Sequence, residues 1–313
     1  MKSVVTFGET MGLFRATSVG SLEHVSDFAL GIGGAESNVA VALARLGTPV
    51  TWVGRVGADA LGRRVLRELR AEGIAVNGII DSSAPTGLMI KEQRTNDATR
   101  VQYYRSGSAG SRLSIDDLAE VDIVGSALLH ITGITPALSD SAHQAVLGAM
   151  SIARDAGVPV SFDVNHRASL WRRNPSAVYQ ELASRADVVF AGIDEARLLS
   201  PEATTPEELA SGVAELGPRQ VVIKLGDAGC IALVEGRRFV QAAVRVRAID
   251  TVGAGDAFVA GYLAELLAGL TVEQRLTTAV TLGAFACVNP GDWEGFPTRE
   301  ELTLLNASEP VQR

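Results

Sequence analysis

Residues 153–163 read ARDAGVPVSFD, in which a helix-like segment ends at Gly157 and a short apolar run follows at once. The same order recurs in ARLGTPVTWVG (44–54), LRAEGIAVNGII (69–80) and AELGPRQVVIKLG (214–226). A glycine just past the last helical turn takes the left-handed conformation that closes a helix. The runs after these glycines are apolar almost throughout, as in strands buried on both faces. This alternation predicts right-handed βαβ crossovers, and so an α/β fold with a mainly parallel sheet and helices on both faces.

Two early stretches, 12–30 and 86–108, depart from this pattern. They contain short alternating runs joined by polar turns, which is typical of half-exposed antiparallel strands. We expect them to form a small sheet over one edge of the main sheet, where it would be a lid on a cleft. Surface hairpins without a role are the alternative. The length of 313 residues fits one domain, 1–313, that includes this accessory sheet.

Composition excludes several classes of protein. The formal charge of −8 argues against a nucleic-acid partner or an anionic membrane. Cys230 and Cys287 lie far apart without a CxxC pair, which argues against a disulfide scaffold and fits a reducing compartment. The opening MKSVVTFGET lacks the apolar stretch of a signal peptide, and no apolar run of about 18 residues could span a membrane. We therefore expect a cytoplasmic protein.

The stretch DTVGAGDAF (250–258) places small residues between a strand-like run and a helix expected over 255–268. Glycines let a backbone turn sharply and approach a ligand. Free N–H groups and the positive dipole end of the helix would then form an anion hole for a phosphoryl group. Asp256 could accept a proton from a hydroxyl that attacks phosphorus. The alternative is that Asp256 only caps the helix.

Other phosphate and metal motifs are missing from the sequence. There is no GxxxxGK[ST], which excludes a P-loop. GIGGAES (31–37) has Glu36 where a dinucleotide fingerprint has its third glycine. The four histidines are scattered, so a histidine metal site is not expected.

GGAESNVAVALARLG (33–47) and DTVGAGDAFVAG (250–261) resemble the paired signatures of the ribokinase-like carbohydrate kinase family. The resemblance extends over essentially the whole chain and implies a ribokinase-like fold and an ATP-dependent sugar kinase. Four further stretches resemble the 2-keto-3-deoxygluconate kinases of that family, which phosphorylate the terminal hydroxyl of a six-carbon keto acid: YYRSGSAGS (103–111), HITGITPALS (130–139), DVNHRASLW (163–171) and GDWEGFPTREEL (291–302).

The resemblance implies roles in phosphoryl transfer. Asp256 would be the catalytic base, and the N–H groups of Gly253, Ala254, Gly255 and Asp256 would stabilise the transferring group. Lys224 would border ATP, and since it ends an apolar run, ATP phosphates would supply the partner that a buried charge needs. The other residues implied at ATP are Asn165, Gly226, Gly229 and Asn289.

The resemblance also implies a sugar site. Gly34 and Asn38 would hold sugar hydroxyls, with Gly34 lacking a side chain so that the ligand can approach the backbone. Asp292 would meet another hydroxyl. The acid end of the substrate would be held by Tyr103, Arg105 and Arg167. Met89 stands near the substrate where related keto-acid kinases often have tyrosine, so one hydroxyl contact is missing.

Two metal ions are implied in the same way. Glu195 would position Mg²⁺ through water, although Gly192 stands where the family usually has asparagine. Asp250 begins a stretch that resembles a monovalent-cation loop, which makes K⁺ a candidate. A kinase of a neutral sugar such as fructose or ribose stays open, as does a protein that binds sugar or nucleotide without turnover. Because exposed strand edges invite pairing, we also expect a homo-oligomer built on the lid.

Overall fold

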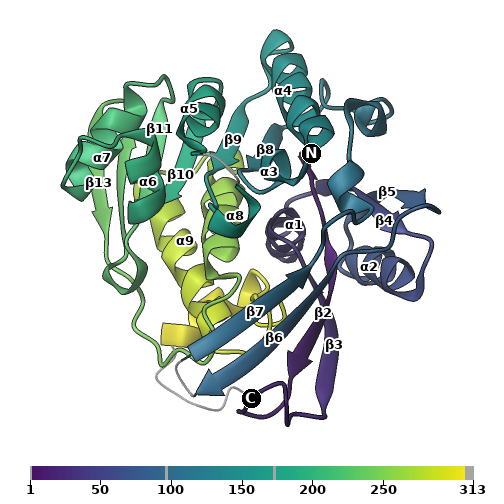
Figure 1. The fold of residues 1–313 in the computed structure, drawn as a ribbon. Helices are drawn as coiled ribbons and strands as arrows, with labels where there is room; N and C mark the ends of the chain where they lie inside the picture. The colour runs from purple at the N-terminus through teal and green to yellow at the C-terminus, as the bar shows by residue number, and fades with distance from the viewer. Residues whose placement is uncertain (1, 96–97, 172–173, 307–313) are drawn as a thin grey trace.

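The computed structural model describes residues 2–95, 98–171 and 174–306 (Figure 1). In this part of the chain nine strands form one large sheet in the order β13-β12-β11-β10-β9-β8-β1-β4-β5. From β11 to β5 every neighbouring pair is parallel, and β12 and β13 add an antiparallel edge. The strands are β1 (Val4–Phe7), β4 (Val50–Gly57), β5 (Ala75–Asp81), β8 (Leu128–Thr132), β9 (Val160–Asp163), β10 (Val188–Gly192), β11 (Gln220–Lys224), β12 (Cys230–Val234) and β13 (Arg237–Gln241).

Helices cover both faces of this sheet, as the sequence predicts (Figure 1). One face packs against α1 (Ala35–Arg45), α2 (Ala60–Ala71), α8 (Ala254–Leu267) and α9 (Val272–Cys287). The other packs against α4 (Asp140–Asp155), α5 (Ser176–Ser184), α6 (Ile193–Leu199) and α7 (Pro206–Ala214), and the short α3 (Thr135–Leu138) precedes α4. Successive strand residues such as Val188 and Val189 enter opposite layers, which is why these strands are apolar throughout.

The helix-closing glycines behave as predicted. Gly47, Gly73, Gly157 and Gly217 all have positive φ, between 69° and 135°. The runs that follow them are β4, β5, β9 and β11 of the large sheet. The helix expected over 255–268 is α8, displaced by one residue.

The two early stretches contribute a separate sheet in the order β3-β2-β6-β7. Its strands are β2 (Met11–Ala16), β3 (Phe28–Gly33), β6 (Leu88–Thr95) and β7 (Ala98–Tyr104), and residues 96–97 of the predicted stretch lie outside the described residues. The expectation of antiparallel strands is correct for two pairs, but β2 and β6 pair in parallel. The reason is that β2 follows β1 and β6 follows β5, so both leave the large parallel sheet in the same direction.

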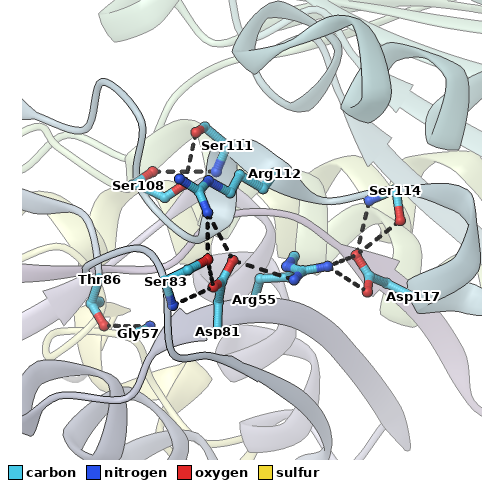
Figure 2. A network of polar contacts seen from close by, with 10 residues as sticks. All are labelled: Arg55, Gly57, Asp81, Ser83, Thr86, Ser108, Ser111, Arg112, Ser114 and Asp117. Carbon is cyan, nitrogen blue, oxygen red and sulfur yellow. Dashed lines mark hydrogen bonds and ion pairs between the residues drawn. The ribbon is translucent and has the colours of Figure 1, made fainter.

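A polar network holds together two of the connections between the body and the small sheet, the one from β5 to β6 and the one that follows β7 (Figure 2). Asp81, at the end of β5, accepts hydrogen bonds from Ser83 on the outgoing connection and from Arg55 of β4. Arg112, on the returning connection, donates to Ser83 over 2.7 Å. Arg55 also donates to both carboxylate oxygens of Asp117, at 3.0 and 3.1 Å. Of the segments that join the small sheet to the body, the one before β6 and the one after β7 are therefore bonded to each other.

In the described part of the chain, none of the helices has the length and apolar character needed to cross a membrane.

Candidate active site

The loop before α8 turns because of Gly253. This residue is the N-cap of α8 and has φ 80°, the left-handed region that favours glycine. A Cβ at this position would lie 1.8 Å from the backbone oxygen of Asp292, so the neighbouring loop also requires glycine here. The first N–H groups of a helix have no partner within it. Ala254 donates weakly to the oxygen of Thr251, at 3.3 Å, and Ala257 donates to the oxygen of Gly253, so the N–H groups of Gly255 and Asp256 are the candidates for the predicted anion hole.

The Asp256 carboxylate is held by two side-chain amides. Nδ2 of Asn38, in α1, lies 2.8 Å from Oδ2, and Nδ2 of Asn165, after β9, lies 3.0 Å from Oδ1. Asp256 is only 7% exposed. Its oxygens therefore face groups from two other elements, whereas the capping alternative requires them to face the helix backbone.

Burial raises the pKa of Asp256 to about 7, and the nearby Asp163 carboxylate adds to this rise. The hydrogen bond from Asn38 and the charges of Arg167 and Lys224 act in the opposite direction. A base with a pKa near the working pH is the most effective for proton transfer at that pH. The site thus holds a carboxylate suited to accept a hydroxyl proton near neutrality.

Lys224, at the end of β11, is paired within the protein. Its Nζ lies 2.8 and 3.0 Å from the two carboxylate oxygens of Asp163, at the end of β9. Adjacent parallel strands thus already bring a carboxylate partner to Lys224, so ATP phosphates are not needed to explain its burial, and its contact with ATP stays a prediction. Burial raises the pKa of Asp163 to about 6 in spite of this pairing. A Cβ on Gly255 would lie 3.5 Å from Lys224 Nζ, so the ammonium group adjoins the start of α8.

Glu195 lies in the first turn of α6 and accepts two backbone hydrogen bonds. Its oxygens receive the N–H groups of Gly192, at 2.6 Å, and of His166, at 2.8 Å. Among the described residues there is no group of three or more His, Cys, Asp or Glu side chains that could hold a metal ion directly. Both Glu195 oxygens already accept backbone hydrogen bonds, and its contact with Mg²⁺ through water stays a prediction.

The predicted nucleotide residues occupy two places. Gly226 and Gly229 flank the turn after β11, and both have positive φ. A Cβ on Gly229 would lie 2.0 Å from the backbone oxygen of Gln241 in β13, so packing alone requires glycine there. Asn289 follows α9 and is exposed, whereas Asn165 is buried beside Asp256.

The predicted sugar residues surround the start of α1. Gly34 is its N-cap, but a Cβ there would lie 2.4 Å from the backbone oxygen of Glu9. Contact with the protein's own backbone is thus sufficient to exclude a side chain at Gly34, and ligand approach is not needed to explain it. A Cβ on Gly33 would fall 2.3 Å from Met89 Cε and 2.4 Å from Asp292 Oδ2, so these two side chains meet at the end of β3.

The three residues predicted for the acid end differ in their surroundings. Arg105 is 8% exposed, and its Nε and one terminal nitrogen lie 2.7 and 2.6 Å from Oε2 of Glu9. Tyr103 is 41% exposed. The Arg105 guanidinium lies over its ring, with the guanidinium carbon 5.7 Å from the ring centroid. Arg167 is exposed, near enough to lower the pKa of Asp256.

Sequence reasoning missed three charged residues of this region: Glu9, Lys91 and Asp163. Glu9 pairs with Arg105, Asp163 with Lys224, and Lys91 with both Asp250 and Asp292. The chain has only three lysines, at 2, 91 and 224, and Lys91 stands in an alternating stretch. A lysine at a strand position expected to be half buried needs a partner for its charge, and this was the one signal that could have identified Lys91.

Comparison with known proteins shows which proteins this chain resembles. The family model described as pfkB family carbohydrate kinase matches residues 1–299. A 2-dehydro-3-deoxygluconokinase of Bacillus subtilis (strain 168) is 40% identical over 99% of this chain and 97% of its own length. A crystal structure of a PfkB protein from Polaromonas sp. JS666 is 38% identical, with a TM-score of 0.87 over 97% of this chain and 99% of that one. A fructokinase from Vibrio cholerae O395, crystallised with fructose, ADP and calcium, is 26% identical with a TM-score of 0.85, over 97% of this chain and 99% of that one.

The chain therefore belongs to the pfkB family of carbohydrate kinases. The ribokinase-like fold and the kinase class predicted from the two paired signatures are confirmed.

Proposed function

We propose that this kinase uses ATP to phosphorylate the terminal hydroxyl of 2-keto-3-deoxygluconate (2-dehydro-3-deoxygluconate). The observation that carries phosphoryl transfer is the buried Asp256 carboxylate, held by two amides at the start of α8. The choice of acceptor is supported by the relatives named 2-dehydro-3-deoxygluconokinase, which are 40% and 35% identical to this chain. Three of the relatives named fructokinase are 26% to 31% identical.

In the proposed reaction the terminal hydroxyl gives its proton to Asp256 while its oxygen bonds to the γ-phosphorus of ATP. The bond from that phosphorus to the oxygen bridging to the β-phosphate breaks, and ADP leaves with the bonding electrons. The N–H groups of residues 253–256 and the positive end of α8 stabilise charge on the phosphoryl oxygens. Asn38 and Asn165 hold the carboxylate toward the acceptor. Asn38 Oδ1 is buried without a protein partner among the described residues, which suits it to accept a hydrogen bond from a sugar hydroxyl.

ATP would lie along the ends of β9 and β11. Lys224, already paired with Asp163, would face its phosphates, and Asn165, Gly226, Gly229 and Asn289 would border the rest. The Glu195 carboxylate raises the pKa of Asp163, and the Asp163 carboxylate raises that of Asp256, with the half-buried Lys224 as the cation beside them. This acidic surplus suits a divalent cation, and Mg²⁺ would be held by phosphate oxygens and through water by Glu195. When bound, it neutralises phosphate charge.

The sugar would lie between the small sheet and α1. Gly34, Asn38, Met89 and Asp292 would line it, with Asp292 accepting a hydrogen bond from a sugar hydroxyl. Tyr103, Arg105 and Arg167 would face the acid end, where charge-assisted pairs are about twice as strong as neutral hydrogen bonds. Two observations favour a neutral sugar such as fructose as the second candidate: Glu9 already pairs with Arg105, and Met89 has no hydroxyl.

A panel of phosphate acceptors tests the proposal. ADP formation is followed in a coupled enzyme assay. The kcat/KM is measured for 2-keto-3-deoxygluconate, 2-keto-3-deoxygalactonate, fructose and ribose. We expect the gluconate-derived keto acid to be the best acceptor by a wide margin, since a site built for a carboxylate penalises ligands that leave its donors unpaired. A preference for fructose or ribose overturns the keto-acid assignment in favour of the second candidate.

The proposal also covers where the enzyme is located and how its copies associate. We place it in the cytoplasm, where ATP is supplied and thiols such as Cys230 and Cys287 remain reduced. We also propose that the small sheet acts as a lid and that copies of the chain associate through it. Its edge strands β3 and β7 carry exposed apolar side chains, including Phe28 at 38% and Tyr104 at 57% exposure.

A further inference from the structure

A lysine of the small sheet lies between two buried carboxylates of the main body. Nζ of Lys91, in β6, is 2.5 Å from Oδ2 of Asp250 and 3.2 Å from Oδ1 of Asp292. The three side chains are 3%, 7% and 5% exposed, respectively. Because a buried charge is stable only when it is paired, these residues form one ionic cluster.

This cluster is attached to the loop that begins α8. Asp250 Oδ1 accepts the N–H of Val252 at 3.1 Å, and Oδ2 accepts the N–H of Gly291 at 3.3 Å. The backbone oxygen of Asp292 lies directly against Gly253, the N-cap of α8. The Lys91 ammonium therefore helps to fix the positions of both loops. These loops in turn place the first N–H groups of α8.

We propose that the Lys91 ammonium is the built-in cation of this loop and that it positions the anion hole in place of a potassium ion. Asp250 is the residue at which the sequence resemblance implies a monovalent-cation loop. An ammonium group is a compact point charge that binds oxygen ligands, and Nζ already occupies the space between the two carboxylates. The described residues at Asp250 therefore do not fit an added K⁺. Lys91 is a positioning residue, since it reaches the reacting atoms only through the loop.

The response of the wild-type enzyme to K⁺ is the first test. The inference rests on the proposed function only in the choice of acceptor, so kcat is measured with whichever acceptor the enzyme uses best. K⁺ is exchanged for tetramethylammonium at constant ionic strength. We expect kcat to change by less than about fivefold, the lower end of typical coupling between two sites. A larger activation by K⁺ overturns the proposal.

Two variants of the same residue provide the second test. Lys91→Ala removes the cation and leaves room for an ion, whereas Lys91→Met removes the charge but fills the space. We expect both to lose roughly 10²-fold in kcat, the loss that follows a misplacement of about 1 Å. K⁺ or NH₄⁺ should restore Lys91→Ala by more than about fivefold and leave Lys91→Met unchanged. Lys2→Ala, at an exposed lysine, is the control for loss of a lysine as such.

Melting temperature gives a readout that needs no substrate. K⁺ should raise the melting temperature of Lys91→Ala above its value in tetramethylammonium. The melting temperatures of the wild type and of Lys91→Met should be the same in both salts. A soluble Lys91→Ala that responds to K⁺ in neither melting nor turnover overturns the proposal and leaves the acceptor assignment standing. If Lys91→Ala does not fold, the wild-type response to K⁺ decides. A wrong acceptor, in contrast, alters the substrate panel and leaves the melting results unchanged.

Discussion

Nδ2 of Asn38 lies 2.8 Å from Oδ2 of Asp256, although 218 positions separate the two residues in the chain. The contact joins the first long helix to the start of α8, so each of the two signature segments supplies one partner. The residue proposed to hold the sugar also orients the proposed base. The proposed roles therefore couple binding of the acceptor to proton transfer through one amide group.

Asp256→Asn removes the basic group and keeps the size of the side chain. We expect kcat to fall by about 10²–10⁴-fold, the usual contribution of a general base, while the affinity for ATP changes little. Steady-state kinetics and nucleotide titration measure both quantities. Asp155→Asn, at an exposed residue of α4, is the matched control. Near-normal turnover of Asp256→Asn would show that this carboxylate is not the base.

The pH dependence of the reaction should report the same group. Because burial raises the pKa of Asp256 to about 7, the free enzyme should be largely protonated there below that pH. We expect kcat/KM to fall roughly tenfold per pH unit on the acid side and to level off above about pH 8. A profile without an acid limb between about pH 5.5 and 8 would contradict this assignment.

The contribution of Asp256 to the stability of the fold should decrease as the pH rises, whereas the activity increases. The pKa of Asp256 is about 7 in the fold, against an ordinary value of 3.8, so the folded state keeps a proton that the unfolded chain has released. Its stabilising contribution is full below about pH 4 and is lost by ~1.4 kcal/mol per pH unit as the pH rises toward about 7. The melting temperature of Asp256→Asn minus that of wild type should therefore rise between about pH 5 and pH 8. A constant difference would mean that the pKa is not raised.

Arg167→Leu tests recognition of the acid end. Loss of a charge-assisted hydrogen bond costs about 1.5–3 kcal/mol, so kcat/KM for 2-keto-3-deoxygluconate should fall by about 10–100-fold. Fructose should be affected little. Both are measured well above the pKa of Asp256, because Arg167 also lowers that pKa. Arg154→Leu, at an exposed position of α4, is the control. Equal losses for the two acceptors would mean that Arg167 positions the site generally or contacts ATP.

Phe28→Asp tests association through the small sheet. Phe28 begins the edge strand β3 and is 38% exposed, so a charge there should oppose pairing of edges. Light scattering should show an oligomer for the wild type and a monomer for the variant. Val240→Asp, at a residue of β13 that is 68% exposed, is the control at the edge of the other sheet. A wild type that is monomeric and fully active at micromolar concentration would exclude this association.

Local patterns predicted most of the fold because helix ends and buried strands leave local signals. The glycines at 47, 73, 157 and 217 mark helix ends through backbone conformation alone. The pairing of β2 with β6 was mispredicted, because its direction depends on where both strands leave the large sheet.

The same distinction holds within the site. Asp256 was predicted from a nine-residue stretch and its resemblance, whereas the partners of the charged residues were not. Lys224 meets Asp163 from 61 positions away, and Arg105 meets Glu9 from 96. A single sequence contains no measure of such distances, so it identifies which residues are charged and leaves open which charges face each other.

The bonded connections beneath the small sheet also limit how this enzyme can be engineered. Exchange of the small sheet for that of another sugar kinase is an attractive way to alter acceptor choice. Arg55, Asp81 and Arg112 come from β4, the end of β5 and the connection after β7. A graft that takes the connections with the small sheet but leaves β4 and β5 behind would separate Arg55 and Asp81 from Arg112. A transplanted unit that includes these two connections therefore has to include the Asp81 carboxylate and the β4 side chain that hold them.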